Sequence, residues 1–296
     1  MPLGEERLAV AFALIALGVL LFAAWLAASA ERRRREAGRL AIPNIVHFVY
    51  GMREQTEPFR FVSYVAVLSA FLVNEPEEIF LHYHYLPYGL WFDALRRDVP
   101  VLRLVFVELP TRFGTKPIKQ TAHRADAVRM EVLRRHGGIY MDMDTISARP
   151  YHHLRGEEMV MGLEADGALC NAVMMSAPEG RFLRAWMGRY EEAFVTDGWC
   201  EASVQLPFIL AEELPSLIRV LPQRTFFWPT FTETAAIFLD SNDIPEELLT
   251  LHLWDSYSNS LTEQIKDWSW ATENGHTLYG KLLQHVWGLW RARAHT

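Results

Sequence analysis

The chain of 296 residues is poor in cysteine and carries no surplus of basic charge. It has 2 cysteines, Cys170 and Cys200, so one disulfide is possible but a disulfide framework is excluded. It has 29 Lys and Arg against 36 Asp and Glu, and it lacks a long basic stripe, which argues against nucleic acid as a partner. Hydrophobic residues make up 50% of the chain and aromatic residues 12%, so we expect a folded protein and not a disordered one.

Several catalytic signatures are also missing. The sequence contains no G-x-S-x-G elbow, no Walker loop and no G-x-G-x-x-G fingerprint. Its histidines and two cysteines have no spacing that suits a structural zinc site. The sequence therefore offers no support for a nucleophilic hydrolase, a P-loop enzyme or a classical dinucleotide-binding enzyme.

Charged residues are absent from Leu8 to Ala30, and the cluster Arg32 to Arg35 follows at once. A run of this length can cross a bilayer core of about 30 Å, so we predict a membrane anchor over residues 1–30. Residues 31–41 are then a charged juxtamembrane linker. The positive-inside rule places the chain beyond residue 31 in the cytoplasm.

A cleaved signal peptide is the alternative, because Ala28-Ser29-Ala30 resembles a small-residue cleavage site. The apolar run is long for a signal peptide, and Glu5 and Glu6 leave its N-terminal side without positive charge. These two features favour an uncleaved anchor.

Apolar β-type runs alternate with helix-type segments from residue 42 onward, which predicts an α/β fold with a mostly parallel sheet. The predicted strands are Ile42–Tyr50, Ile79–Tyr85, Leu102–Leu109, Gly138–Met141, Glu158–Leu163, Cys170–Ser176 and Leu249–Trp254, with others near Ile218 and Phe226. The predicted helices are Phe59–Val73, Leu90–Arg97, Thr121–His136, Phe182–Phe194 and 276–293. We assign residues 42–260 to a catalytic domain and residues 261–296 to a C-terminal helical extension.

The most informative segment follows the predicted helix Thr121–His136. The helix ends at Gly137-Gly138, and a short strand then leads to Asp142 and Asp144. Open α/β sheets bind ligands outside the carboxyl ends of their strands. Hard divalent cations take carboxylate oxygens and share their remaining positions with phosphates. The segment therefore predicts a metal-bridged phosphate ligand, and a solvated turn is the alternative.

Other polar residues have two interpretations each. Asp126 and Arg129 share a face of the predicted helix, where they could hold ribose and phosphate or form an intrahelical ion pair. His252 lies in an apolar strand pattern, where it is either a core residue or a ligand for Mn²⁺. His47 in the first strand has the same two interpretations.

Four segments together resemble glycosyltransferase family 32, whose sugar-binding region contains a DXD motif. The family's opening strand resembles Ile42–Tyr50 (IPNIVHFVY), and its long signature resembles Ala122–Asp144. Its asparagine-bearing strand resembles Cys170–Met174, and its late H-x-W element resembles His252-Leu253-Trp254. Initiating mannosyltransferases and α-1,4-galactosyltransferases belong to this family.

The resemblance implies a GT-A-like, Rossmann-like mixed sheet flanked by helices. It implies a membrane-anchored, metal-dependent, retaining hexosyltransferase. The enzyme would move a hexose or N-acetylhexosamine from a UDP- or GDP-sugar to a glycan or glycolipid acceptor. It also implies a Golgi membrane location with a lumenal catalytic domain. Bacterial members work on the cytoplasmic side, so both orientations stay open.

The resemblance also implies roles for individual residues, with Mn²⁺ or Mg²⁺ as the cofactor. The implied catalytic residues are Asp142, Asp144 and Asn171. The implied nucleotide-sugar ligands are His47, Asp126, Arg129, Tyr140, Asp142, Trp254 and Ser256, and the implied metal ligands are Asp142, Asp144 and His252.

The sequence departs from the family pattern at two places. Tyr50 stands where tryptophan is common, and Asp255-Ser256-Tyr257 replaces a Gly-Ser-Trp continuation. The second departure leaves the third metal ligand open between His252 and Asp255 with Ser256.

Two other functions use the same carboxylates. One is a metal-dependent phosphohydrolase acting on nucleotide diphosphates, which needs more acids for a second metal. Glu131, Glu164 and Asp166 are the candidates for these acids. The other is a non-catalytic member of the family.

Overall fold

The computed structural model describes residues 42–165 and 167–294, and the predicted anchor and linker lie outside these residues. In the described part of the chain, no helix is both long enough and apolar enough to span a membrane.

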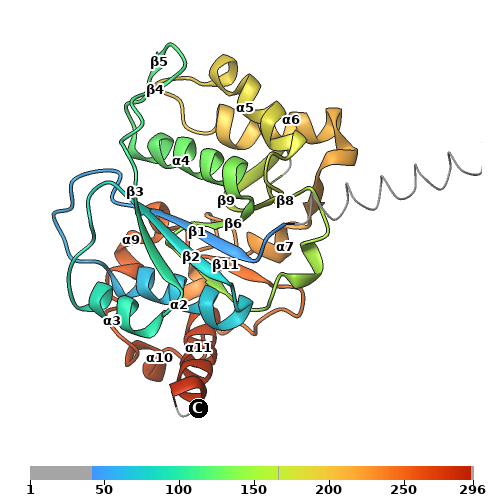
Figure 1. Cartoon of the computed structure of the whole chain (residues 1–296). Coiled ribbons are helices and arrows are strands. Elements are labelled where there is room, and N and C mark those ends of the chain that lie inside the picture. The colour runs from blue at the N-terminus through green and yellow to red at the C-terminus, as the bar shows by residue number, and fades with distance from the viewer. Residues whose placement is uncertain (1–41, 166, 295–296) are drawn as a thin grey trace, which may run out of the picture. The chain divides into compact units, whose positions relative to one another are not determined.

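A mixed sheet forms the centre of the fold (Figure 1). Within residues 42–294 it has seven strands in the order β10-β8-β9-β6-β1-β2-β3. Their bounds are β1 Ile45–Tyr50, β2 Glu78–Tyr83, β3 Leu102–Phe106, β6 Gly138–Met141, β8 Met159–Ala165, β9 Ala168–Ser176 and β10 Arg219–Leu221. Only β9 runs antiparallel to its neighbours in this set, so the carboxyl ends of β1, β6 and β8 reach the same edge.

Two short strand pairs complete the β structure of the described residues. β7 (Thr145–Ser147) pairs with β11 (Thr250–His252), and β4 (Arg112–Phe113) pairs with β5 (Lys116–Pro117). The main helices are α2 Phe61–Asn74, α3 Leu90–Asp98, α4 Thr121–His136, α5 Arg181–Ala193, α6 Leu206–Glu213 and α11 Leu278–Ala294. Shorter helices are α7 Gln223–Phe226, α8 Ala235–Phe238, α9 Asp255–Thr262 and α10 Trp270–Glu273.

Helices cover both faces of the sheet, α4, α5 and α6 on one face and α2, α3 and α11 on the other (Figure 1). Successive strand residues point to opposite faces. In β1, Val46 and Phe48 belong to the core under α2, whereas Val49 belongs to the core under α4. Because the sheet is buried on both faces, the sequences of its strands are continuous apolar runs and do not alternate with polar residues. The α/β class and the mixed sheet flanked by helices are confirmed.

Most predicted elements are present, and α4 has the predicted bounds. The strand predicted near Ile218 is confirmed as β10, but the strand predicted near Phe226 is wrong. Phe226 ends helix α7, and Phe226 and Phe227 are buried against Gly162 of β8. The apolar sequence reflects this burial and not a strand, which a short apolar run cannot distinguish.

The Gly137-Gly138 turn joins α4 directly to β6. The N–H of Gly137 donates to the carbonyl of Leu133 at 2.8 Å and closes the helix. Gly137 and Gly138 have φ values of 63° and 102°, which favour glycine. A Cβ on Gly138 would lie 2.6 Å from Cγ1 of Ile45. The turn therefore fixes where β6 starts relative to the helix before it.

We predict that Gly138→Ala lowers the free energy of unfolding by about 2–4 kcal/mol, through backbone strain and the clash with Ile45. Gly188→Ala is the matched control, because no atom lies within 4 Å of a Cβ at this position in α5. That change should be neutral or stabilise by up to about 1 kcal/mol. Urea unfolding followed by circular dichroism measures both, and equal midpoints would contradict the prediction.

Candidate active site

Asp142 and Asp144 leave the carboxyl end of β6 on a tight turn. The N–H of Asp142 donates to the carbonyl of Ala172 at 2.8 Å and extends the β6–β9 ladder. The hydroxyl of Thr145 donates to the carbonyl of Asp142 at 2.8 Å and closes the turn into β7. The backbone that carries both carboxylates is therefore held by hydrogen bonds, at the edge of the sheet where open α/β folds bind ligands.

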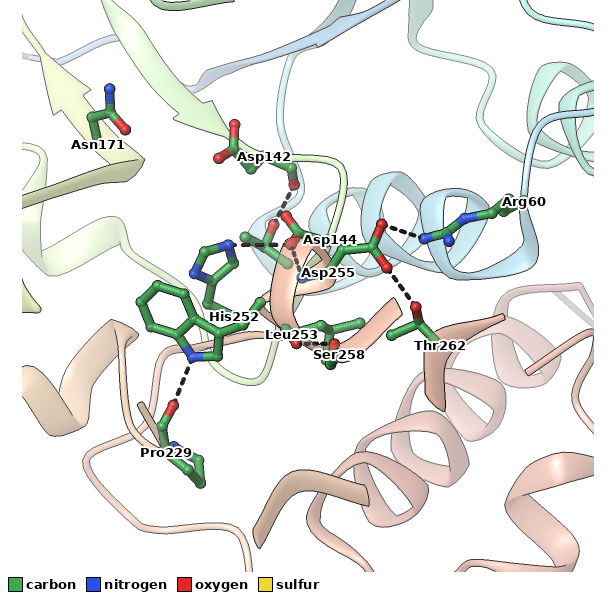
Figure 2. Close-up of polar contacts among 12 residues, drawn as sticks. Arg60, Asp142, Asp144, Asn171, Pro229, His252, Leu253, Asp255, Ser258 and Thr262 are labelled. Carbon is green, nitrogen blue, oxygen red and sulfur yellow. Dashed lines mark hydrogen bonds and ion pairs between the residues drawn. The ribbon is translucent and has the colours of Figure 1, made fainter. Parts of the chain in front are cut away.

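Asp144 is tied to the late strand β11. This strand pairs with β7 and places His252 opposite Thr145. Nε2 of His252 lies 3.3 Å from Oδ2 of Asp144, and the N–H of Asp255 donates to the same oxygen at 2.9 Å (Figure 2). The N–H of Leu253 donates to the carbonyl of Asp144 at 2.8 Å. Two segments far apart in the sequence therefore meet at one carboxylate.

Asp142, Asp144 and His252 can hold a metal ion together. Each offers one ligand atom, and these atoms lie within 4.8 Å of one another. In the described residues this is the one group of three or more His, Cys, Asp or Glu side chains with such spacing. Two carboxylate oxygens and one imidazole nitrogen suit Mn²⁺, and carboxylates also suit Mg²⁺. Nδ1 of His252 has no hydrogen-bond partner in the described part of the chain, so Nε2 is the nitrogen directed at the carboxylates.

The protonation of the group follows from its charges. Burial raises the pKa of Asp142, and Asp144 raises it further, whereas Arg129 opposes the shift. Burial would also raise the pKa of Asp144, but the charge and hydrogen bond of His252 outweigh it and lower the pKa to about 2. Burial would lower the pKa of His252, but Asp144 outweighs it and the net pKa is raised. The raised pKa means that the protonated imidazole is favoured more than in a free histidine, and a metal ion bound at Nε2 would displace that proton.

Arg129 is the buried cation behind this group, with 5% of its surface exposed. Its Nη1 donates to the carbonyl and to Oδ1 of Asn171, at 2.9 and 3.1 Å. Its Nη2 lies 3.2 Å from Oδ1 of Asp142, and its guanidinium lies 4.5 Å from the ring centroid of Tyr140. The hydroxyl of Tyr140 also donates to Oδ1 of Asp142. Arg129 thus positions Asp142 and Asn171 and keeps positive charge beside the aspartates.

Asp126 supports Asn171 from the same helix. Its Oδ1 accepts from Nδ2 of Asn171 at 2.8 Å, and its Oδ2 accepts from the hydroxyl of Tyr190 at 3.1 Å. Nε of Arg129 lies 3.5 Å from Oδ1 of Asp126, so the ion pair foreseen on this helix face is present. Asp126 has 4% of its surface exposed, so it positions Asn171 in this structure and does not lie open to a ligand.

A β-bulge directs Asn171 toward α4. The register of β8 and β9 jumps from Met161 opposite Met174 to Gly162 opposite Cys170. The residues between Cys170 and Met174 on β9 therefore have no partner on β8. Bulges of this kind often re-aim a side chain next to an active site.

A cavity of about 570 Å³ opens beside the carboxylates. Its walls are the loop after β1 (51–58), the first turns of α4, Tyr140, Asp142, Asp144 and Asp255. Among its described lining residues, six are acidic and two are basic, Arg53 and Arg60. This excess of negative charge repels an anionic ligand unless a cation is bound.

His47 is a predicted site residue that the structure does not bring to this cavity. Its ring is fully buried, with Nδ1 3.0 Å from Nε2 of His82 and Nε2 3.0 Å from the carbonyl of Gly137. Burial and the neighbouring His82 lower the pKa of His47 to about 3, so the ring is neutral. The geometry is that of a hydrogen-bonded core histidine at the end of α4.

Trp254 and Ser256 were predicted to bind the nucleotide sugar, but neither lines the cavity. Trp254 is buried, its indole N–H donates to the carbonyl of Pro229 at 2.8 Å, and its ring centroid lies 4.1 Å from that of His252. Trp254 therefore supports the imidazole. Ser256 is exposed at the start of α9 and does not line the cavity.

The Asp255 carboxylate is directed away from the metal-ligand group (Figure 2). Its Oδ2 lies 2.7 Å from Nη2 of Arg60, and its Oδ1 accepts from the hydroxyl of Thr262. His252 is therefore the third ligand that this geometry supports.

Sequence reasoning did not identify Tyr190 or Arg60. Tyr190 is four residues after Trp186 on α5, so the pattern indicates only core packing. Arg60 directly precedes α2, and its nearness to Asp255 depends on the tertiary fold.

Residues 77–161 match the family model described as "Glycosyltransferase sugar-binding region containing DXD motif". The match includes α4, β6 and both aspartates of the turn. These residues therefore contain the sugar-binding region of this glycosyltransferase family. "Glucan organizing enzyme 1" of Cryptococcus neoformans var. grubii is 34% identical to it over 205 residues. The alignment covers 64% of this chain and 55% of that protein, so the chain spans about half the length of this relative.

Solved glycosyltransferase structures are also similar. GlyE of Streptococcus pneumoniae TIGR4 has a TM-score of 0.47 at 14% identity, over 76% of this chain and 63% of that one. The PaToxG glycosyltransferase has a TM-score of 0.44 at 13% identity, over 64% of this chain and 78% of that one.

The raised pKa of His252 predicts that Mn²⁺ binding releases a proton. Below the folded pKa of His252 the ion competes with this proton, so affinity should rise with pH and level off above that pKa. Calorimetry in buffers of different ionisation enthalpy measures the release. His252→Ala should weaken binding and abolish the release, whereas His153→Ala, at an exposed site, should change neither. Release of the same proton by His252→Ala would refute the assignment.

Proposed function

We propose that the protein is a Mn²⁺- or Mg²⁺-dependent, retaining glycosyltransferase. It moves a hexose or N-acetylhexosamine from a UDP- or GDP-sugar to a glycan or glycolipid acceptor. The observation that carries the proposal is the group of Asp142, Asp144 and His252, whose two aspartates line an acid-rich cavity. A cavity with this charge needs a divalent cation to hold a diphosphate.

Each part of the site has a role in this reaction. Asp142, Asp144 and His252 would hold the cation, which when bound would neutralise the charge that develops on the leaving diphosphate. Asn171, held by Arg129 and Asp126, would contact the donor sugar. Since none of the aspartates that hold the cation is free to act as a covalent nucleophile, we propose front-face displacement.

The geometry favours transfer over a two-metal phosphohydrolase. Glu131 is engaged by Arg134 and Arg135 on α4, and Glu164 is outside the metal-ligand group. Asp166 lies outside the described residues. A second metal therefore has no ligand set among the residues that the structure describes. The intact ligand group likewise favours an enzyme over a non-catalytic family member.

The acceptor class, the membrane anchor over residues 1–30 and the Golgi location stay predictions. The name of the fungal relative supports including glucan oligosaccharides among the acceptors to test.

Asp144→Asn should reduce metal-dependent donor hydrolysis by about 10³-fold, because it removes a charge that holds the cation. The assay measures release of UDP or GDP from UDP-glucose, UDP-galactose, UDP-N-acetylglucosamine and GDP-mannose, with Mn²⁺ or with EDTA. Asp240→Asn is the control at an exposed position, and circular dichroism checks that both variants fold.

The products of this assay distinguish the two enzyme classes. A glycosyltransferase breaks the bond between sugar and phosphate and yields free sugar and a nucleoside diphosphate. A phosphohydrolase yields sugar 1-phosphate and a nucleoside monophosphate. Full activity of Asp144→Asn, or turnover unaffected by EDTA, would contradict the proposed function.

A further inference from the structure

A second cavity, of about 300 Å³, adjoins the acid-rich cavity. Four of the described residues line both cavities, namely Glu57, Pro58, Arg60 and Glu263. The other walls of the second cavity come from the start of α2, from α3, and from the end of α9 and the loop after it. Ligand pockets in proteins have volumes of about 300–1,000 Å³. The second cavity is therefore large enough for a small ligand, and it lies next to the cavity that holds the aspartates.

Helix α9 connects the second cavity with the metal-ligand group. Asp255 begins this helix, and its N–H donates to Oδ2 of Asp144 at 2.9 Å. Asp255, Asn259 and Glu263 follow one another at spacings of four residues, so they share one face of the helix, and all three line the first cavity. Thr262 and Glu263, at the other end of the helix, line the second cavity. A ligand that extends from the aspartates along this face therefore reaches the second cavity.

Arg60 lies where the two cavities meet. Its Nη2 lies 2.7 Å from Oδ2 of Asp255 (Figure 2), and its Nη1 donates to Oδ1 of Asn259 at 3.2 Å. These contacts hold the guanidinium in place at the junction. A guanidinium carries five N–H donors, so donors remain for a ligand that passes from one cavity to the other.

Trp91 gives the second cavity a fixed aromatic surface. Its indole N–H donates to the carbonyl of Lys266 at 3.0 Å, which ties α3 to the loop after α9. The ring centroid of Trp91 lies 4.8 Å from that of Phe61 and 5.1 Å from that of Tyr64. The ring is partly exposed and lines the cavity. Since its one polar group is already bonded, the surface that it offers to a ligand is apolar.

The charges around the second cavity are balanced, unlike those around the first. Its described lining residues include two acids, Glu57 and Glu263, and two bases, Arg60 and Lys266. Balanced charge suits a neutral ligand better than a second phosphate. A sugar ring has matching chemistry, because it presents C–H groups on its face and hydroxyls at its edge. The C–H groups pack on the negative face of an aromatic ring, and the hydroxyls form hydrogen bonds with charged side chains.

We propose that the second cavity binds one sugar of an oligosaccharide acceptor, the sugar next to the one that is glycosylated. This sugar stacks on Trp91 and places a hydroxyl on Arg60. The accepting sugar then lies between the second cavity and the aspartates. The inference rests on the proposed function and narrows its acceptor to neutral glycans of two or more sugar units.

The test compares transfer to long and short acceptors by the wild-type protein and by Trp91→Leu. The donor is the nucleotide sugar that the wild-type protein cleaves in the panel above. The acceptors are hexasaccharides of glucose, mannose and N-acetylglucosamine, and the methyl glycosides of the same three sugars. In the wild type, the KM of the best hexasaccharide should be about 10-fold below that of its methyl glycoside, because one aromatic contact is gained.

Trp91→Leu should remove this difference by raising the KM of the hexasaccharide. The KM of the methyl glycoside, the KM of the donor and kcat should each stay within about twofold, since only binding in the second cavity is lost. Trp91→Met should give the same result and keeps more of the buried volume, so it replaces Trp91→Leu if that variant does not fold. Melting temperatures check the fold of each variant.

Trp290→Leu is the matched control. Trp290 is also partly buried and packs against the same core as Trp91, but it lines neither cavity. Saturation-transfer NMR of the hexasaccharide, with Mn²⁺ and UDP or GDP present, measures binding without turnover. The ring C–H signals should receive saturation from the wild type and from Trp290→Leu, and much less from Trp91→Leu.

Four results would overturn the inference while the proposed function stands. The first two are equal KM values for hexasaccharide and methyl glycoside in the wild type, and an unchanged hexasaccharide KM in Trp91→Leu. The third is weakened binding of UDP or GDP in Trp91→Leu, which would assign the second cavity to the nucleotide. The fourth is transfer to none of the acceptors while the donor is still hydrolysed. Failure of the wild-type protein to cleave any donor would instead contradict the proposed function.

Discussion

The site depends on keeping two carboxylates ionised next to each other at the end of one buried strand. Asp142 and Asp144 repel each other, and burial raises the pKa of Asp142. Arg129 from α4 compensates Asp142, and His252 from β11 compensates Asp144. Both groups come from other segments, so the arrangement depends on the Gly137-Gly138 turn and on the β7–β11 pair. Removing Arg129 would leave a partly buried carboxylate uncompensated, which is strongly destabilising.

The strand that carries these aspartates also separates the cavity from the Asn171 side of the site. On its β1 side, an acid-rich cavity of about 570 Å³ suits a diphosphate only together with a cation. On its β9 side lies Asn171, held by Arg129 and Asp126.

The parts of this arrangement that local sequence determines were predictable. The α4 helix, its glycine stop and the strand ending in Asp142 depend on adjacent residues and have the predicted positions. What depends on tertiary contact was not. The bulge that directs Asn171 depends on how β8 and β9 pair, which the sequence does not give. The sequence around Tyr190 indicates only core packing, although its hydroxyl bonds to Asp126. His47 could be a ligand or a core residue until its partners His82 and Gly137 are known. The residues around Phe226 are apolar because they are buried against Gly162, and not because they form a strand. An apolar run alone does not distinguish these two cases, so the strand prediction was wrong.

The most direct measurement of the central claim is anomalous diffraction at the manganese edge from a crystal grown with Mn²⁺ and UDP or GDP. The account predicts one anomalous peak bound by Asp142, Asp144 and His252, at about 2.0–2.3 Å from its ligand atoms. The diphosphate should lie against the peak and the nucleoside in the cavity beside the loop after β1. A nucleotide bound elsewhere, or a cavity holding nucleotide with no metal at these residues, would contradict the account.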